Sequence, residues 1–336
     1  MTSENSSQSS LRIDSKVVPG SSISPDRNQE NLANDIFART NIVPIVTPLD
    51  SNGAPLLSTN ALVSFLNYLQ ELRVTHLFVL GETGEFRFLK NAERIAFAEA
   101  LVPLAAAKGF KILLNVSAEE LNLTRENIAR FATMVGVDAL ILCPLWRGNL
   151  RIMEDSASAR FLSEKPVVLY NNPGITDGNN IGDDQLKALR GRIAALKDSS
   201  GDINIVRRYR AASRQFGFTL YLGAEALLAQ CLAEQASEER SEVQGIVGAS
   251  GQIYDGCIRL LAEKDVSKRE ALQNELTNMM QSISENYRAI PAAVKRVLAN
   301  FGIIPNANLV SGNSAVLRST GTEAVEKFFP KKAASQ

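Results

Sequence analysis

Hydrophobic residues are grouped along the chain in short blocks. Between Asn41 and Lys264, eight short apolar runs alternate with eight stretches in which apolar residues recur at helical spacing. A continuous apolar run is typical of a strand in a parallel sheet that is covered on both faces. Eight such strand–helix units predict an α/β fold, a (β/α)8 TIM barrel. The runs cover 42–47, 77–80, 111–116, 138–143, 166–170, 193–197, 218–222 and 243–249.

An open, doubly wound sheet is the alternative for such an alternation. Its dinucleotide-binding form carries a Gly-x-Gly-x-x-Gly segment after the first strand, and no such segment follows the first run here. We therefore expect the barrel to span residues 37–265. Residues 266–336 contain further helical patterns but no second core, so they predict a C-terminal extension of about three helices packed on the barrel.

The first 36 residues differ in composition from the rest. Residues 1–36 are rich in Ser, Asn and Asp and contain few large apolar residues, which predicts a disordered N-terminal tail. Its acidic residues argue against a transit peptide, and it lacks the apolar segment of a secretory signal. We expect a cytoplasmic protein, and the sequence leaves open whether the tail is a targeting segment.

Charge and residue counts exclude several classes of protein. Lys plus Arg and Asp plus Glu are both 36, so a basic surface for nucleic acid or for a membrane is not expected. The only histidine is His76, which disfavours a histidine-ligated metal site and a Ser-His-Asp triad. The three cysteines form no Cys-x-x-Cys pair. We expect no metal and no cofactor, and any acid–base chemistry must come from Tyr, Lys, Asp, Glu or the substrate.

Two ionisable residues end neighbouring strands of the predicted barrel, on the face where barrel enzymes carry their active sites. Tyr170 ends the fifth apolar run and Lys197 ends the sixth. A lysine at a strand end usually reaches water with its amine. A buried lysine instead loses its proton more easily and becomes an amine nucleophile that forms Schiff bases with ketones. The tyrosine hydroxyl would then shuttle protons.

Small and polar residues follow other strands of the barrel. The segment Gly81-Glu82-Thr83-Gly84-Glu85 comes directly after the second run. Its glycines permit a tight turn with exposed backbone N–H groups, which suits a carboxylate. Thr47 ends the first run, and Gly248 lies in the eighth, where we expect the backbone to pass close to a small ligand.

These motifs occur in the same order as in a known family. The chain resembles the dihydrodipicolinate synthase/N-acetylneuraminate lyase family of class I aldolases over about residues 41–302. The resemblance implies a TIM barrel with extra C-terminal helices, a homo-oligomer (a dimer or tetramer) and a 2-keto acid substrate such as pyruvate. It also implies that Lys197 forms the Schiff base, that Tyr170 transfers protons, and that Thr83 and the Gly84 N–H bind the carboxylate. The segments that carry it are Gly81–Glu85, Tyr170-Asn171-Asn172-Pro173, Lys197-Asp198 and Gly245–Gly248.

Three positions depart from the pattern of the synthases in this family. Glu82 stands where the turn normally has Ser or Thr, which belongs to a proton relay with Tyr170. Trp146 stands nearest to a relay tyrosine that follows the fourth strand, and Ile175 replaces an arginine that binds the second substrate. A typical dihydrodipicolinate synthase is therefore not expected. Glu82 is either a catalytic carboxylate or a charge that weakens keto-acid binding.

The sequence thus predicts a carbon–carbon lyase that acts on a hydroxylated or sugar-derived 2-keto acid through a lysine Schiff base. Its catalytic residues would be Lys197, Tyr170 and Glu82, and Thr47, Thr83, Gly84, Ile175 and Gly248 would bind substrate. A dehydratase of a deoxy-keto-sugar acid would use the same Schiff base. A dihydrodipicolinate synthase-like paralogue and a catalytically silent keto-acid-binding barrel are further alternatives, the latter because two relay positions have changed.

Overall fold

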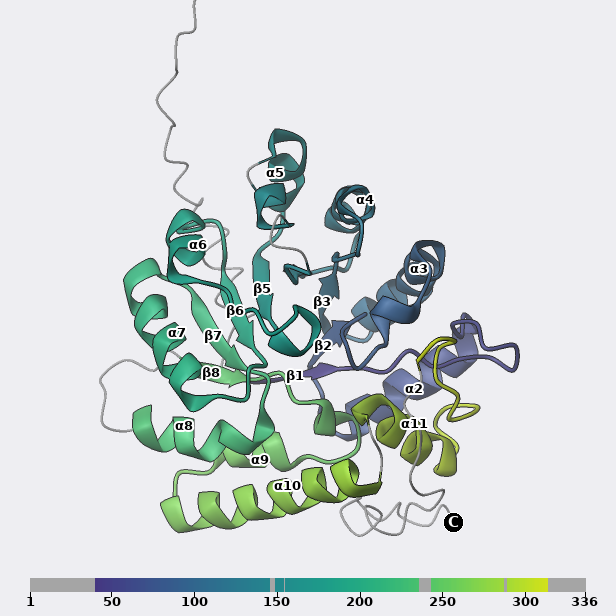
Figure 1. The fold of residues 1–336 in the computed structure, drawn as a ribbon. Helices are drawn as coiled ribbons and strands as arrows, with labels where there is room; N and C mark the ends of the chain where they lie inside the picture. The colour runs from purple at the N-terminus through teal and green to yellow at the C-terminus, as the bar shows by residue number, and fades with distance from the viewer. Residues whose placement is uncertain (1–39, 146–148, 154, 236–242, 287–288, 314–336) are drawn as a thin grey trace, which may run out of the picture.

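A computed structural model describes residues 40–145, 149–153, 155–235, 243–286 and 289–313. Its eight strands form one closed parallel barrel in the order β1 to β8, which confirms the predicted TIM barrel. Figure 1 shows the strands at the centre and the helices around them. The strands are β1 (Thr40–Pro44), β2 (His76–Val79), β3 (Lys111–Asn115), β4 (Ala139–Leu142), β5 (Val167–Asn171), β6 (Ala195–Asp198), β7 (Thr219–Leu222) and β8 (Val243–Ile246).

Each strand is followed by at least one helix that packs on the outside of the barrel. This layer consists of α2 (Thr59–Glu71), α3 (Asn91–Ala107), α4 (Leu121–Ala132), α5 (Ser156–Leu162), α6 (Asp183–Ala188), α7 (Ile203–Phe216), α8 (Leu228–Gln235) and α9 (Gly256–Ala262). Short 3-10 helices lie between strand and helix: η1 (Phe86–Phe88), η2 (Asn149–Met153), η3 (Pro173–Ile175), η4 (Glu225–Leu227) and η5 (Ala249–Gln252).

Side-chain alternation along the strands separates two cores. In β5, Val167 and Leu169 join the large cluster between strands and helices, whereas Val168 and Tyr170 belong to a second cluster inside the barrel. Successive residues of a strand point to opposite faces, so one set faces the helices and the other faces the barrel axis. The interior cluster comprises Ile42, Phe78, Leu113, Ala139, Ile141, Cys143, Val168, Tyr170, Ala195, Tyr221 and Val247.

The barrel closes where β1 meets β8. The two strands pair through Thr40 with Gly245 and Asn41 with Ile246. Beyond this pairing, the fully buried Gln252 takes the place of a ladder residue. Its Oε1 accepts the Val46 N–H at 2.8 Å and its Nε2 donates to the Pro44 carbonyl at 2.8 Å.

Two described helices follow the barrel, α10 (Val266–Asn286) and α11 (Ile290–Asn300). In Figure 1, α10 lies outside α8 and α9, which it contacts, and α11 contacts both α10 and η5. The predicted tail, Trp146 and the C-terminal part of the predicted extension, from residue 314, lie outside the described residues. Among the helices that the structure describes, none is long and apolar enough to cross a bilayer.

Candidate active site

Lys197 and Tyr170 lie side by side at the C-terminal ends of β6 and β5. They are direct register partners in the parallel sheet, and each is almost completely buried. Both occupy barrel-facing positions, since they lie two residues after Ala195 and Val168 of the interior cluster. Beyond them, Asn171 Nδ2 donates to Asp198 Oδ1 at 2.7 Å, which ties the two strand ends together.

The amine of Lys197 lies against aromatic faces. Its Nζ is 3.8 Å from the centre of the Tyr170 ring and 4.8 Å from the centre of the Phe78 ring. Burial disfavours the ammonium form and lowers the pKa of Lys197 to about 7, although Cys143, Glu82 and Asp198 favour the charged form. About half of the lysine is therefore a neutral amine near pH 7.

The hydroxyl of Tyr170 is kept in its neutral form. Burial raises the pKa of this phenol well above its usual value, and the nearby Cys143 and Glu82 raise it further. Asn172 Nδ2 donates to the phenol oxygen at 2.8 Å, and the side chain of Ser199 also hydrogen-bonds to the phenol. The phenol is suited to donate a proton to a neighbouring oxygen or carbon and to recover it afterwards.

The six residues after Leu80, from Gly81 to Phe86, have the hydrogen-bond pattern that commonly ends a helix. The Phe86 N–H donates to the Gly81 carbonyl at 3.3 Å, and the Glu85 N–H donates to the Glu82 carbonyl at 2.9 Å. Glu85 has the left-handed backbone conformation, with φ of 57°. Together these three features define a Schellman motif with Glu85 at its left-handed position.

The middle of this turn presents unused donors. Neither Thr83 nor Gly84 gives its backbone N–H to an acceptor within the part of the chain that the structure describes. The Thr47 hydroxyl donates to the Gly84 carbonyl at 2.7 Å and so holds the turn against the end of β1. Gly84 packs closely there, because an added Cβ would lie 3.1 Å from the Ile45 carbonyl oxygen. Thr47 thus supports the turn.

Glu82 points its carboxylate toward the same region. Its Oε2 is buried and has no hydrogen-bond partner among the described residues. Burial raises the pKa of Glu82, and Arg87 and Lys197 partly oppose that rise by favouring the carboxylate. Glu82 is therefore close enough to Lys197 for their charges to interact, and it is a more basic group than an exposed glutamate.

The remaining predicted residues lie at the same end of the barrel in different roles. Ile175, in η3, is partly buried and packs against the interior cluster. Gly248 is surrounded by protein atoms: an added Cβ would lie 2.9 Å from Glu225 Oε1 and 3.1 Å from Cys257 Sγ. The close approach at Gly248 is thus to the chain itself.

Sequence patterns did not single out three residues of this site. Phe78 covers the amine of Lys197, Cys143 directly follows β4 close to Lys197, and Arg87 favours the ionised form of Glu82. The inward place of Phe78 follows from alternation once β2 is assigned. No local pattern marks Arg87, whose effect depends on how η1 folds back over the turn.

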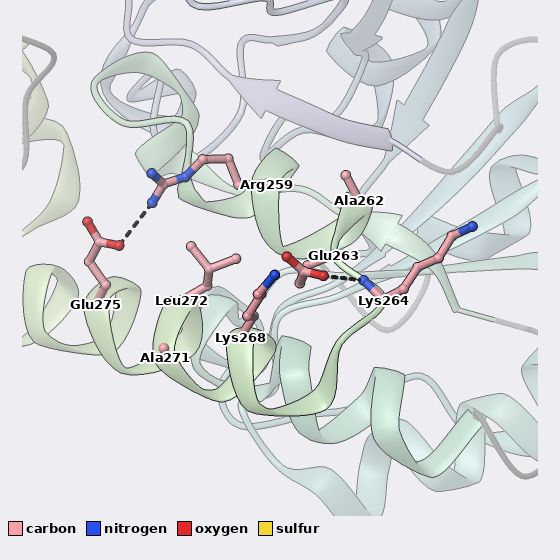
Figure 2. Close-up of a pocket in the computed structure, with 8 residues that line it drawn as sticks. All are labelled: Arg259, Ala262, Glu263, Lys264, Lys268, Ala271, Leu272 and Glu275. Carbon is pink, nitrogen blue, oxygen red and sulfur yellow. Dashed lines mark hydrogen bonds and ion pairs between the residues drawn. The ribbon is translucent and has the colours of Figure 1, made fainter.

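A surface pocket elsewhere in the molecule is separate from this site. Figure 2 shows it where the end of α9 meets α10. Its walls carry charged side chains that are already engaged, since Arg259 binds Glu275 at 2.9 Å. No predicted site residue lines this pocket, whose lining is Arg259, Ala262, Glu263, Lys264, Lys268, Ala271, Leu272 and Glu275.

A known protein family matches most of the chain. The model of the dihydrodipicolinate synthetase family matches residues 38–311, most of the chain. The chain belongs to this family. The match includes every residue of the site described above. It confirms the family expected from the motifs, and the names of the relatives below support the expected carbon–carbon lyase.

Curated relatives in the family carry two kinds of name. A 2-dehydro-3-deoxy-D-gluconate/2-dehydro-3-deoxy-phosphogluconate aldolase of Picrophilus torridus is 26% identical over 242 residues, 70% of this chain and 85% of the relative. A 4-hydroxy-tetrahydrodipicolinate synthase of Bacillus velezensis is 28% identical over 222 residues, 62% of this chain and 72% of the relative.

Solved structures show the same fold. The 2-keto 3-deoxygluconate aldolase from Picrophilus torridus superposes with a TM-score of 0.66 at 22% identity, covering 79% of this chain and 94% of that structure. The wild-type sialic acid aldolase of Ruminococcus gnavus superposes with a TM-score of 0.72 at 16% identity, covering 86% and 95%. Two aldolases named for different substrates therefore share the fold of this chain.

Proposed function

We propose that this protein is a class I aldolase that forms a Schiff base between Lys197 and a 2-keto acid of the pyruvate type. The observation that carries the proposal is the buried amine of Lys197, whose pKa is about 7 and which lies 3.8 Å from the centre of the Tyr170 ring. A neutral amine at the mouth of a barrel is a nucleophile ready for a ketone. The relative named as a 2-dehydro-3-deoxy-D-gluconate aldolase supports this interpretation.

The turn after β2 would orient the keto acid. Its carboxylate would accept hydrogen bonds from the free N–H groups of Thr83 and Gly84 and from the Thr83 hydroxyl. Three donors from one turn would fix both the position and the rotation of the carboxylate. The ketone carbon is then held against the Lys197 amine, and this positioning accounts for a large part of the rate enhancement.

The proposed reaction begins with formation of a Schiff base on the Lys197 amine. Neutral Lys197 attacks the ketone carbon, and the carbinolamine loses water after Tyr170 donates a proton to its oxygen, giving an iminium. In cleavage, a base removes the proton from the C4 hydroxyl. The C3–C4 bond breaks, an aldehyde leaves, and the electron pair passes into the iminium to form an enamine. The base returns its proton to C3 of the enamine, and water then hydrolyses the iminium, which releases pyruvate, restores the neutral amine and returns a proton to Tyr170.

Glu82 is the group we propose for the proton on the C4 hydroxyl. Tyr170 enters the reaction as a neutral phenol and acts first as a proton donor, because its pKa lies far above neutrality, whereas Glu82 ionises more readily and has a buried oxygen without a partner among the described residues. A substrate hydroxyl would supply that partner. We therefore infer a substrate with a hydroxyl at C4, such as a 2-keto-3-deoxy sugar acid. The apolar Ile175 offers no charge for the carboxylate of a second substrate of the synthase type.

A crystal soaked with pyruvate tests this proposal. We expect continuous density between Lys197 Nζ and the keto carbon, with the pyruvate carboxylate on Thr83 and Gly84. The Lys197→Met variant, soaked identically, serves as the control and should show at most non-covalent pyruvate at the turn. Pyruvate bound at the barrel mouth without a bond to Lys197 would favour the silent keto-acid-binding barrel instead.

A further inference from the structure

A fully buried ion pair joins the turn after β2 to the C-terminal extension. Lys295 Nζ, on α11, lies 2.5 Å from Glu85 Oε1, and neither side chain is exposed to solvent. The other carboxylate oxygen of Glu85 accepts the Val310 N–H at 2.9 Å and the Asn313 side-chain amide at 2.7 Å. Three parts of the extension therefore converge on one residue of the turn.

The position of Glu85 in the turn makes this arrangement unusual. The left-handed position of a Schellman motif is normally glycine, because a Cβ there is unfavourable by about 1 kcal/mol or more. Glu85 adopts this conformation with φ of 57°. The turn itself gains nothing from a glutamate there, so the side chain must be retained for its contacts with Lys295, Val310 and Asn313.

The amine of Lys295 also contacts a second segment of the C-terminal extension. Its Nζ donates to the Asn308 carbonyl at 3.0 Å, in addition to its contact with Glu85. A buried ion pair contributes little net stability, because both charges lose their hydration. What such a pair does provide is a fixed geometry, since either charge left alone in the interior is strongly unfavourable.

We infer that Lys295 is a positioning residue that fixes the carboxylate-binding turn through its ion pair with Glu85. Glu85 directly follows Gly84 and closes the hydrogen-bonded turn that contains Thr83. Held by Thr47 at one side and by Lys295 at the other, the turn keeps its two free N–H groups in one orientation. The inference rests on the proposed function for the role of those N–H groups, but the restraint on the turn is independent of it.

The test separates positioning from stability with a double variant. Glu85→Gln with Lys295→Met removes both charges, so no buried charge is left unpaired and the fold is retained. Glu85→Gly with Lys295→Met is the second variant, because it relieves the left-handed conformation, deletes the carboxylate and leaves no buried ammonium unpaired. The control is Lys111→Met, which removes a lysine from its ion pair with Asp138 near the start of β3, at the other end of the barrel.

Two readouts are measured on each variant of the full chain. The first is the hydrogen exchange of the peptide that contains residues 81–86, which we expect to become at least tenfold faster in both turn variants and unchanged in Lys111→Met. The second is covalent trapping of pyruvate by borohydride at Lys197. We expect half-saturation at a pyruvate concentration about tenfold higher, with the rate at saturation and its pH midpoint near 7 retained.

The outcomes discriminate between the two claims. Native exchange at residues 81–86 in the folded double variants overturns the positioning role, and so does native half-saturation for pyruvate. Loss of thermal stability with both readouts unchanged also overturns it, because that result describes a purely structural pair. If the native protein is not trapped by pyruvate at all, the proposed function fails, and the exchange measurement still decides the role of Lys295.

Discussion

Lys197 differs from Lys295, the other buried lysine among the described residues, in what surrounds its amine. Lys295 faces the carboxylate of Glu85 at 2.5 Å, whereas the amine of Lys197 faces the rings of Tyr170 and Phe78. A carboxylate partner compensates a buried ammonium, and aromatic faces do so only weakly. Lys295 is therefore part of an ion pair, whereas Lys197 is close to a neutral amine.

Replacement of Glu82 should separate cleavage of the substrate from formation of the Schiff base. Glu82→Gln keeps the shape of the side chain but removes its basicity, so we expect cleavage of a 4-hydroxy-2-keto acid to slow by about 10²- to 10⁴-fold while borohydride still traps pyruvate at Lys197. Because burial raises the pKa of Glu82 and the carboxylate is the active form, activity of the native enzyme should fall as the pH drops through that raised pKa. Steady-state kinetics against pH measure both effects.

The matched control for Glu82→Gln is Glu263→Gln, which changes a half-buried glutamate in the pocket of Figure 2, away from the barrel mouth. We expect native kinetics from it. Glu82→Thr, which restores the hydroxyl that the family has in the turn, tests the opposite view. A rise in pyruvate proton exchange in Glu82→Thr would identify Glu82 as the defect of a silent barrel and contradict its catalytic role.

Among the elements, the strands were predictable and their ends were less so. Eight apolar runs gave eight strands because burial on both faces of a parallel sheet demands apolar residues. The first run was expected to end at Thr47, but β1 ends at Pro44. The Ile45 N–H still donates to Phe78 of β2, whereas the Val46 N–H binds the side chain of Gln252 instead of β8. The end of β1 therefore depends on a contact with a distant residue.

In the site, too, some contacts follow from the order of the strands, and others join residues that are far apart in the sequence. The pairing of Tyr170 with Lys197 followed from the order of parallel strands, and the structure confirms their register. The ion pair between Glu85 and Lys295 could not be predicted in this way, because no periodicity relates a turn after the second strand to a helix beyond the eighth. Arg87 was missed for the same reason. Where the turn sits depends on the extension as well as on its own sequence.

In the whole molecule, the side-chain amide of Gln252 continues the closure of the barrel beyond the β1–β8 ladder. Gln252 is fully buried and replaces the hydrogen bonds that β1 and β8 no longer make to each other beyond Pro44. It also lies in η5, which α11 contacts, so closure and the C-terminal extension meet at one place. The mouth of the barrel, where Lys197 lies, is held on that side by these contacts.

Gln252→Ala tests this role in closure. The variant leaves the Val46 N–H and the Pro44 carbonyl buried without partners, which we expect to lower the free energy of unfolding by about 2 to 5 kcal/mol. Urea denaturation followed by circular dichroism measures it. The control is Gln70→Ala, which loses one exposed hydrogen bond to the Lys108 carbonyl and should stay within about 0.5 kcal/mol of the native protein. Equal effects of the two changes would contradict a special role for Gln252.

The central claim is that the Lys197 amine is a nucleophile at neutral pH. It is tested most directly by incubating the protein with pyruvate and borohydride across a range of pH and mapping the modified peptide by mass spectrometry. We expect one reduced adduct on Lys197, formed at a rate that rises with pH, reaches half of its maximum near pH 7 and levels off above it, since the neutral amine is the reactive form. An unmodified Lys197 under conditions that label a known class I aldolase would contradict the account.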